Sequence, residues 1–376
     1  MTTVNFSNIL YTRFRSVKSV IAVITFFIIL QAVTITSFME GANVATIKDL
    51  ARLTGLSVAT ISKYLNGGNV LEKNSLVIQQ AIDATNYTLN EHARALKTNT
   101  SRTVGFVTPR FSDVYATQLA SEAAAYLREY NYSLFVFESL NSLEGEIEAL
   151  NFFASKNVDA VMAAFIGDDA HYYQQLLSKY KFPVVLFDKT FDSKVSDSVT
   201  INNLSAAHAA VNKLIEYGHR EIAIVRGDAE HFTSHQRYLG YVQALEEHGI
   251  ELREDYVIEV DYSGIDVFEN ITRLFANKRK PTAIFSVNYF TTVSTIMVLN
   301  QLDYSIPEEI SLFGFDNYDL FKIVKPKPWL MVQPMKAIAQ EGTRMLMDRI
   351  RNQSDQPYRS VVLESEMYVG GSIKHL

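Results

Sequence analysis

Apolar residues follow three different patterns along this chain of 376 residues. Residues 20–35 are almost continuously apolar, and residues 45–97 place apolar side chains at helical spacing. From Thr103 onward, short apolar runs alternate with amphipathic stretches. Since a change of periodicity marks a change of structure, the pattern predicts an apolar N-terminal segment, a small helical domain and a larger α/β region.

The region after Thr103 predicts two consecutive series of buried strands and amphipathic helices. The predicted strands are residues 103–108, 133–138, 160–165, 184–188, 222–226, 257–260, 283–287, 311–315, 329–332 and 361–367. The predicted helices are residues 116–130, 143–155, 170–180, 204–217, 234–248, 267–277, 291–302 and 335–352. Such alternation indicates two parallel sheets flanked by helices, with a ligand cleft at the carboxyl ends of the strands, between two lobes.

The helical region predicts two short helices joined by a glycine turn, the layout of a helix-turn-helix. The turn is Thr54-Gly55-Leu56, and Ser57 is a good N-cap for the second helix. The apolar positions expected to face the small core are Ile47, Leu50, Ala51, Leu53, Ile61, Tyr64 and Leu65, followed by Leu76, Val77, Ala81, Ile82 and Ala84 of a third helix. The alternative is a helical hairpin that serves packing only.

Charge supports nucleic-acid binding at the front of the chain only. The net charge of −6 combines an excess of three basic residues in 1–38, seven basic against five acidic residues in 39–103, and a balance of about −11 in the rest. A polyanion would therefore bind the helical region rather than the α/β region. The absence of cysteine excludes disulfides and thiolate metal sites and fits a reducing compartment.

The apolar segment within residues 1–38 follows Arg13, Arg15 and Lys18 and is typical of a signal anchor or short membrane span. Such an anchor would send the rest of the chain away from the chromosome, against the helix-turn-helix. We expect Met39 to be the true start. A membrane tether through residues 17–38 is the alternative if translation begins at Met1.

Three segments carry a resemblance to a known family. They are Ala45-Thr-Ile-Lys-Asp-Leu-Ala51, Ser57-Val-Ala-Thr-Ile-Ser-Lys-Tyr-Leu-Asn66 and Asn90-Glu-His-Ala-Arg-Ala-Leu96. Together they resemble the headpiece and hinge of the lac-repressor (LacI/GalR) family, and the resemblance continues through the rest of the chain. It implies a headpiece at 45–89, a hinge helix and linker at 90–102, and an effector-binding and dimerisation core at 103–376 with a periplasmic-binding-protein-like fold. The lobes would be about 103–198 with 329–353, and about 199–328 with 354–376.

The resemblance also implies which residues meet DNA. In the headpiece these are Thr46, Ser57, Val58, Ala59, Thr60, Ser62, Lys63 and Asn66, of which the second-helix residues would lie in the major groove. In the hinge they are Asn90, Ala93, Arg94, Leu96 and Lys97, with Leu96 wedged between base steps of the minor groove. Leu89 replaces the proline usual in the family, and a plain linker is the alternative reading of this short segment.

Effector-binding positions come from strand ends combined with the resemblance. They are Tyr115, Arg237, Tyr262, Asn288 and Asp316, with Phe165 and Asp188 as weaker candidates. Arg237 would bind hydroxyls or a carboxylate, Asp316 would accept hydrogen bonds, and the tyrosines would stack on a ring. Each position also has an ordinary structural alternative, as a surface ion pair, a turn cap or a core aromatic.

These observations predict a DNA-binding transcriptional regulator, most simply a repressor. It would act in the cytoplasm as a homodimer on an operator, switched by a sugar-like effector and without a cofactor. The rival is an extracytoplasmic sugar-binding protein of a transport system, which would give the apolar N-terminus a role but none to the headpiece. An enzyme is disfavoured because the sequence contains no nucleophile elbow, P-loop or zinc-protease motif. No metal site is expected either, since His231 and His235 lack a third ligand pattern.

Overall fold

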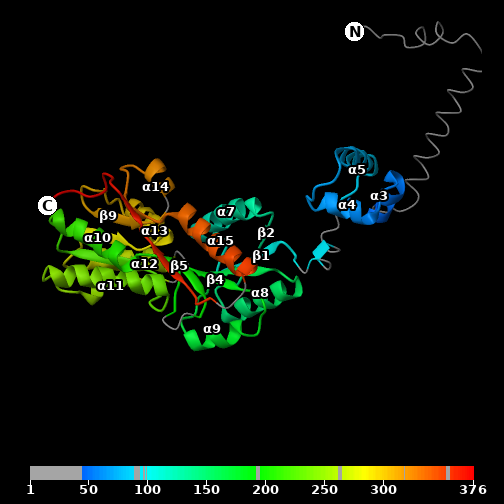
Figure 1. Ribbon diagram of the computed structural model, residues 1–376. Coiled ribbons are helices and arrows are strands. Elements are labelled where there is room, and N and C mark those ends of the chain that lie inside the picture. The colour runs from blue at the N-terminus through cyan, green and yellow to red at the C-terminus, as the bar shows by residue number, and fades with distance from the viewer. Residues whose placement is uncertain are drawn as a thin grey trace, which may run out of the picture. The chain divides into compact units, whose positions relative to one another are not determined.

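The computed structural model describes residues 45–88, 94–95, 98, 100–191, 195–260, 265–316, 318–352 and 356–376. These residues form two compact units that divide between Arg94 and Ala95 (Figure 1). The predicted apolar segment 1–38 lies outside the described residues, as does most of the predicted hinge helix.

The first unit is a three-helix domain around a small apolar core. Its helices are α3 (Ile47–Thr54), α4 (Val58–Leu65) and α5 (Glu72–Thr85). Leu50, Ile61, Ile78 and Ala81 form the buried centre, against which Tyr64 and other apolar side chains pack. Gly55, with a φ of 68°, takes the left-handed conformation that ends α3, so the predicted glycine turn is present.

Four apolar positions expected in this core, Ala84 among them, are exposed instead. Leu53 is 62% exposed, Leu76 61% and Val77 42%, while Ile78 is fully buried. The predicted helical spacing is present. On the third helix, however, Leu76 and Val77 lie on a face that the other two helices leave uncovered, so the buried face is rotated from the predicted one. The core depends on Ile78, Ala81 and Ile82.

The second unit contains two six-stranded sheets of matching order, each the base of one lobe. The first sheet, in the order β11-β5-β4-β3-β1-β2, contains β1 (Thr103–Thr108), β2 (Ser133–Glu138), β3 (Ala160–Ala163), β4 (Val184–Phe187), β5 (Asp197–Ile201) and β11 (Ser360–Leu363). The second, in the order β12-β10-β9-β8-β6-β7, contains β6 (Ile222–Arg226), β7 (Val257–Glu259), β8 (Ala283–Ser286), β9 (Ser311–Phe315), β10 (Trp329–Val332) and β12 (Glu366–Tyr368). All neighbouring strands pair in parallel except β10 and β12, so the expectation of two purely parallel sheets is corrected at that edge.

Helices cover both faces of each sheet, as the alternating pattern predicts. The first lobe carries α7 (Val114–Glu129), α8 (Leu143–Ser155), α9 (Ala170–Leu177) and α15 (Met335–Asn352). The second carries α10 (Asn203–Glu216), α11 (Phe232–Glu247), α12 (Ile265–Ala276), α13 (Tyr289–Gln301) and α14 (Tyr318–Ile323), besides a short 3₁₀ turn at Glu254–Tyr256. Figure 1 shows α8 and α9 on one side of the first sheet and α7 and α15 on the other.

The sheet pairings correct the predicted division of the lobes. Strand β10, expected in the first lobe, pairs with β9 in the second sheet, and β11, expected in the second lobe, pairs with β5 in the first. Residues 361–367, predicted as one strand, are two short strands in different sheets. In the described part of the chain, the backbone therefore crosses between lobes after β5, after β10 and after β11.

A buried ion pair joins the last helix to the first sheet. Arg349 of α15 donates to both carboxylate oxygens of Asp197 at 2.8 and 2.9 Å, and Asp197 is completely buried. Two further donations from Arg349, to the carbonyls of Gln356 and Pro357, satisfy the guanidinium. This bidentate geometry holds α15, the chain after it and the start of β5 together.

Replacing Arg349 with alanine should lower the free energy of unfolding of the core by about 3–5 kcal/mol, because it leaves the Asp197 carboxylate buried without its partner. The matched control is Arg344→Ala in the same helix, whose exposed pairs with Glu341 and Asp348 should contribute at most ~1 kcal/mol. Urea unfolding followed by circular dichroism measures both. Equal losses in the two variants would contradict a structural role for the buried pair.

Candidate functional site: an exposed helix and an interlobe cavity

The second helix of the first unit presents a small, polar surface. Ser57, Val58, Ala59 and Lys63 are exposed, while Thr60 and Ser62 are half-buried and Ile61 faces the core. The side chains near the start of α4 are short, so another molecule could approach the backbone there closely. Lys63 is the only cation of α4, and its side chain is exposed.

Local hydrogen bonds fix both ends of this helix-turn-helix. The Thr60 amide donates to the Ser57 hydroxyl at 3.2 Å, which caps α4, and the Asp49 amide donates to the Thr46 hydroxyl at 3.4 Å in a capping box at the start of α3. Asn66 ends α4 and donates through its side chain to the Ser62 carbonyl at 2.6 Å. Thr46, Ser57 and Asn66 are thus structural caps whose exposed surfaces could also contact a partner.

Part of the predicted contact set cannot be placed. Asn90, Ala93, Leu96 and Lys97 of the hinge, and Tyr262 of the effector set, lie outside the described residues. Their roles stay predictions.

In the second unit, a cavity of about 470 Å³ opens between the two lobes. Segments that follow β1, β3 and β4 line its first-lobe wall, and segments that follow β6, β8 and β9 line its second-lobe wall. Four predicted effector residues, Tyr115, Arg237, Asn288 and Asp316, line this one cavity, as do Phe165 and Asp188. Their convergence follows from the parallel sheets, which bring the carboxyl ends of their strands to the cleft.

Arg237 lies on α11 and is only 3% exposed. Its Nε donates to the Asn203 carboxamide oxygen at 2.9 Å, and its Nη1 donates to the Val287 carbonyl at 2.6 Å. The guanidinium also lies 3.8 Å from the Phe315 ring centroid. These contacts orient the guanidinium firmly and leave Nη2 as its donor without a partner among the described residues.

Asp316 follows β9 and is held from three sides. One carboxylate oxygen accepts from the Gln333 carboxamide at 2.6 Å, and the other accepts from the Tyr289 amide at 3.3 Å and lies 3.8 Å from Arg237 Nη1. Burial raises the pKa of Asp316, and the Arg237 charge opposes the rise. Asp316 therefore links the strand end, α13 and the crossing segment that contains Gln333.

The other two predicted residues that line the cavity are Asn288 and Tyr115. Asn288 caps α13, because its side-chain oxygen accepts from the Thr291 amide at 2.9 Å. Tyr115 is half-buried, and its burial, with the carboxylates of Asp188, Asp316 and Asp113 around it, raises the pKa of its hydroxyl well above the ordinary value. The turn-cap alternative thus applies to Asn288, which also lines the cavity.

The cavity lining also includes residues outside the predicted set, among them Asp113, Gln333 and Thr108. Asp113 caps α7 by accepting from the Tyr115 amide at 3.0 Å, and Thr108 ends β1. Thr108 ends one predicted strand and Gln333 comes directly after another, so the strand-end rule could have found both. Asp113 lies further along the loop after β1, beyond the reach of that rule.

Asp188 follows β4 with a left-handed φ of 62°, and Asp316 follows β9, the equivalent strand of the other lobe, with a φ of 66°. Burial raises the pKa of Asp188 to about 7, opposed by the Arg237 charge and assisted by Asp316 and Asp113. Asp113 keeps accessible surface at the cavity, yet the protein around it raises its pKa to about 6. Ionised Asp188 and Asp113 carboxylates in this cavity therefore carry a desolvation cost.

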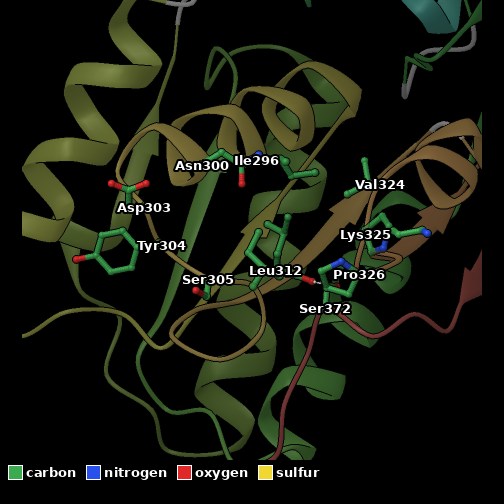
Figure 2. Close-up of a pocket in the computed structure, with 12 residues that line it drawn as sticks. Ile296, Asn300, Asp303, Tyr304, Ser305, Leu312, Val324, Lys325, Pro326 and Ser372 are labelled. Carbon is green, nitrogen blue, oxygen red and sulfur yellow. Dashed lines mark hydrogen bonds between the residues drawn. The ribbon is translucent and has the colours of Figure 1, made fainter.

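A second hollow of about 340 Å³ lies in the second lobe and shares no lining residue with the interlobe cavity (Figure 2). Its wall includes Asn300, Asp303 and Tyr304 on one side and Lys325 and Ser372 on the other. Asp303, Ser305 and Lys325 are exposed, and the Ser372 hydroxyl is already bonded to the Leu312 carbonyl and the Trp329 amide. The charged and unpartnered groups gather in the interlobe cavity instead.

Among the residues that the structure describes, no helix combines the length and the apolarity needed to cross a lipid bilayer.

A helix-turn-helix followed on one chain by a two-lobed core with a cavity at its strand ends defines the class of the protein: a DNA-binding regulator with a ligand-binding core. Residues 46–90 match the family described as bacterial regulatory proteins, lacI family, and residues 211–373 match the periplasmic binding protein-like domain. Catabolite control protein A of Priestia megaterium is 31% identical over 80% of this chain and 91% of its own length. The chain belongs to the lacI family of bacterial regulatory proteins.

Other similarities agree with this family. The transcriptional repressor PurR of Photobacterium profundum is 27% identical over 88% of this chain and 99% of its own length. Among solved structures, the lac repressor dimer bound to operator covers 88% of this chain and 99% of its own, with a TM-score of 0.79 at 17% identity. A complex of the regulator CelR with cellobiose covers 87% and 99%, with a TM-score of 0.65 at 22% identity. These structures share the fold.

The buried Asp188 carboxyl should make the stability of the core depend on pH. Its folded pKa of about 7 exceeds the ordinary value of 3.8, so the folded protein holds this proton more tightly than the unfolded chain. That stabilisation is complete below pH ~4 and is lost as pH rises through 7. Asp188→Asn should therefore unfold less readily than the wild type at pH 8, by on the order of 2 kcal/mol, and should keep only a small part of that advantage at pH 4.5.

Denaturant unfolding at the two pH values tests this expectation. Asp228→Asn, which removes an exposed carboxylate outside the cavity, is the control and should leave the pH dependence unchanged. An Asp188→Asn variant with the pH dependence of the wild type would show that this carboxyl is not penalised in the folded state.

Proposed function

We propose that this protein represses transcription by binding a DNA operator as a homodimer, and that a small molecule in the interlobe cavity controls this binding. The observation that carries the proposal is the presence of both parts on one chain: an exposed, capped second helix in a lacI-family headpiece, and a preformed cavity lined by the strand ends of both lobes. A solute-binding protein of a transport system has no use for the headpiece, so the family assignment favours the regulator. A regulator of chromosomal DNA acts in the cytoplasm.

Several features support the details of this proposal. The names of the relatives include repressors, and the lac repressor structure is a dimer on its operator. Phe135 and Val136 on the edge strand β2 are 42% and 38% exposed, a surface that a second copy of the chain could cover. Acceptors and donors beside Tyr115 and Phe165 suit a polyhydroxylated ring, so we take a sugar-like molecule as the effector class.

The mechanism of control follows from the two-lobed design. A ligand that contacts Arg237 and Asp316 on one wall and residues of the other wall stabilises one relative position of the lobes over another. The paired hinge segments of the dimer would transmit that difference to the headpieces, so effector and operator would compete through one two-state element. The Asp316–Gln333 hydrogen bond lies where the chain crosses between the lobes, so a change in their relative position would alter this bond directly.

Lys63 should contribute to operator binding, because it is the cation on the exposed face of α4. Lys63→Ala should flatten the salt dependence of the affinity by about one unit of slope if the contact is to phosphate. If Lys63 contacts a base edge, discrimination at one operator position should fall by about 1–3 kcal/mol. Fluorescence anisotropy with an operator fragment at several salt concentrations separates these outcomes, with Lys73→Ala on α5 as the control. Unchanged affinity and selectivity in Lys63→Ala would show that Lys63 does not contact the operator.

Asp316 should be required for the effector response. Asp316→Ala should abolish ligand-dependent changes in operator affinity while the headpiece still binds DNA, because the cavity loses the acceptor that also orients Gln333 and the Tyr289 amide. The more conservative Asp316→Asn keeps an acceptor at the site and should weaken rather than abolish the response. Operator affinity measured with and without a panel of sugars tests both variants. A wild-type response in Asp316→Ala would show that the effector binds elsewhere.

A further inference from the structure

The first-lobe wall of the interlobe cavity carries carboxylate oxygens that accept no hydrogen bond from the described residues. Among the described residues, no hydrogen bond or ion pair engages the carboxylate of Asp188, and Asp113 uses one oxygen to accept from the Tyr115 amide. Thr108, completely buried on the same wall, has a hydroxyl without a partner. The carboxylates of Asp188 and Asp113 line the same cavity and therefore offer acceptors to a bound molecule.

The cations around the cavity donate no hydrogen bond to these two carboxylates among the described residues, although the charges of Arg237 and Lys189 act on Asp188. Lys189 lines the cavity, but its ammonium is bonded to the carbonyls of Ile166 and Gly167 and to Asp168, and its side chain is 4% exposed. Arg237 is bonded to Asn203 and Val287 on the opposite wall and lies nearer to Asp316. Arg110 is exposed at the edge of the cavity. The carboxylates of Asp188 and Asp113 therefore keep acceptor oxygens available to a ligand.

Aromatic rings line the same wall. Tyr115 and Phe165 line the first-lobe side of the cavity, and the Tyr115 hydroxyl is close enough to both Asp188 and Asp113 to feel their charges. Carboxylates beside aromatic faces form a binding environment for an organic cation, because both attract positive charge. An anionic group such as a phosphate would meet repulsion there, since two like charges would be forced together in a desolvated space.

We propose that the effector of this protein is an amino sugar, whose protonated amine binds Asp188 and Asp113 on the first-lobe wall while its hydroxyls face Arg237 and Asp316 on the second. This inference rests on the proposed function and adds the chemical class of the ligand. The carboxylate oxygens of Asp188 and Asp113 would then accept hydrogen bonds from the N–H donors of the ammonium group. Since the amine replaces a proton as the counter-charge of these acids, a lower pH should weaken its binding.

Isothermal titration of the full chain tests the proposal with three sets of matched probes: glucosamine, galactosamine and mannosamine, their parent hexoses, and their N-acetyl derivatives. At pH 7.0, at least one hexosamine should bind ten times or more tightly than its parent hexose and its N-acetyl derivative. Its affinity should fall about tenfold between pH 7.0 and pH 5.5, as protons occupy the two carboxyls.

The variant Asp188→Asn should lose at least tenfold of the hexosamine affinity and show a weaker pH dependence over this range, because only Asp113 still titrates there. Asp228→Asn, with the same change of charge outside the cavity, should bind like the wild type. Two results would overturn the amine assignment: equal or tighter binding of a parent hexose or an N-acetyl derivative, and failure of all three hexosamines to bind.

Operator binding without ligand separates this test from the proposed function. If a neutral sugar binds and shifts operator affinity while the hexosamines do not, the regulator proposal stands and the amine assignment falls. If the full chain does not bind any operator-like DNA more tightly than random DNA at moderate salt, the proposed function falls whatever the titrations show.

Discussion

The three crossings between the lobes are the constraint on which the core depends. Because the chain passes from one sheet to the other after β5, β10 and β11, the lobes must place these strand ends side by side. Hydrogen bonds tie two of the crossings together: the Ser365 amide donates to the Asn202 side chain at 3.0 Å, and the Asn202 amide donates to the Leu363 carbonyl at 3.0 Å. The third crossing is tied to a strand end of the second lobe, where Gln333 donates to Asp316. The cavity therefore lies where the lobes are joined, and a ligand in it contacts the same groups that set their relative position.

Much of this fold could be predicted from the sequence, because buried parallel strands read as short apolar runs. The bounds of β1, β2, β6, β9 and β10 agree with the predicted ones for that reason. Strand β5 was missed as a strand of its own because it begins Asp197-Ser198 and includes Thr200, polar residues that do not mark a buried strand. Its burial depends on Arg349, 152 positions away, which neutralises Asp197. No local pattern records a partner at that distance.

The division of the late strands between the lobes failed for a related reason. Residues 329–332 and 360–363 are both short and apolar enough to be strands, and neither pattern says which sheet it joins. That choice is made by pairing, with β9 in one case and β5 in the other. The positions of Arg237 and Asp316 were predictable from strand ends and the resemblance, but the use of Arg237 to bind Asn203 and Val287 was not.

The distribution of charge explains how one chain can serve two ligands of opposite character. The headpiece and hinge sequence is slightly basic and the core is acidic, so the polyanion is attracted to one unit only. Inside the core, the acidity is concentrated rather than spread: Asp113, Asp188 and Asp316 share a cavity with Arg237, and burial raises the pKa of each acid. A site that keeps such a penalty in the absence of ligand gains most from a ligand that removes it. Asp188 and Asp316 follow equivalent strands of different lobes. A ligand that offsets the desolvation cost of both carboxylates must therefore hold the two lobes in one relative position. This coupling makes the cavity suited to control as well as to binding.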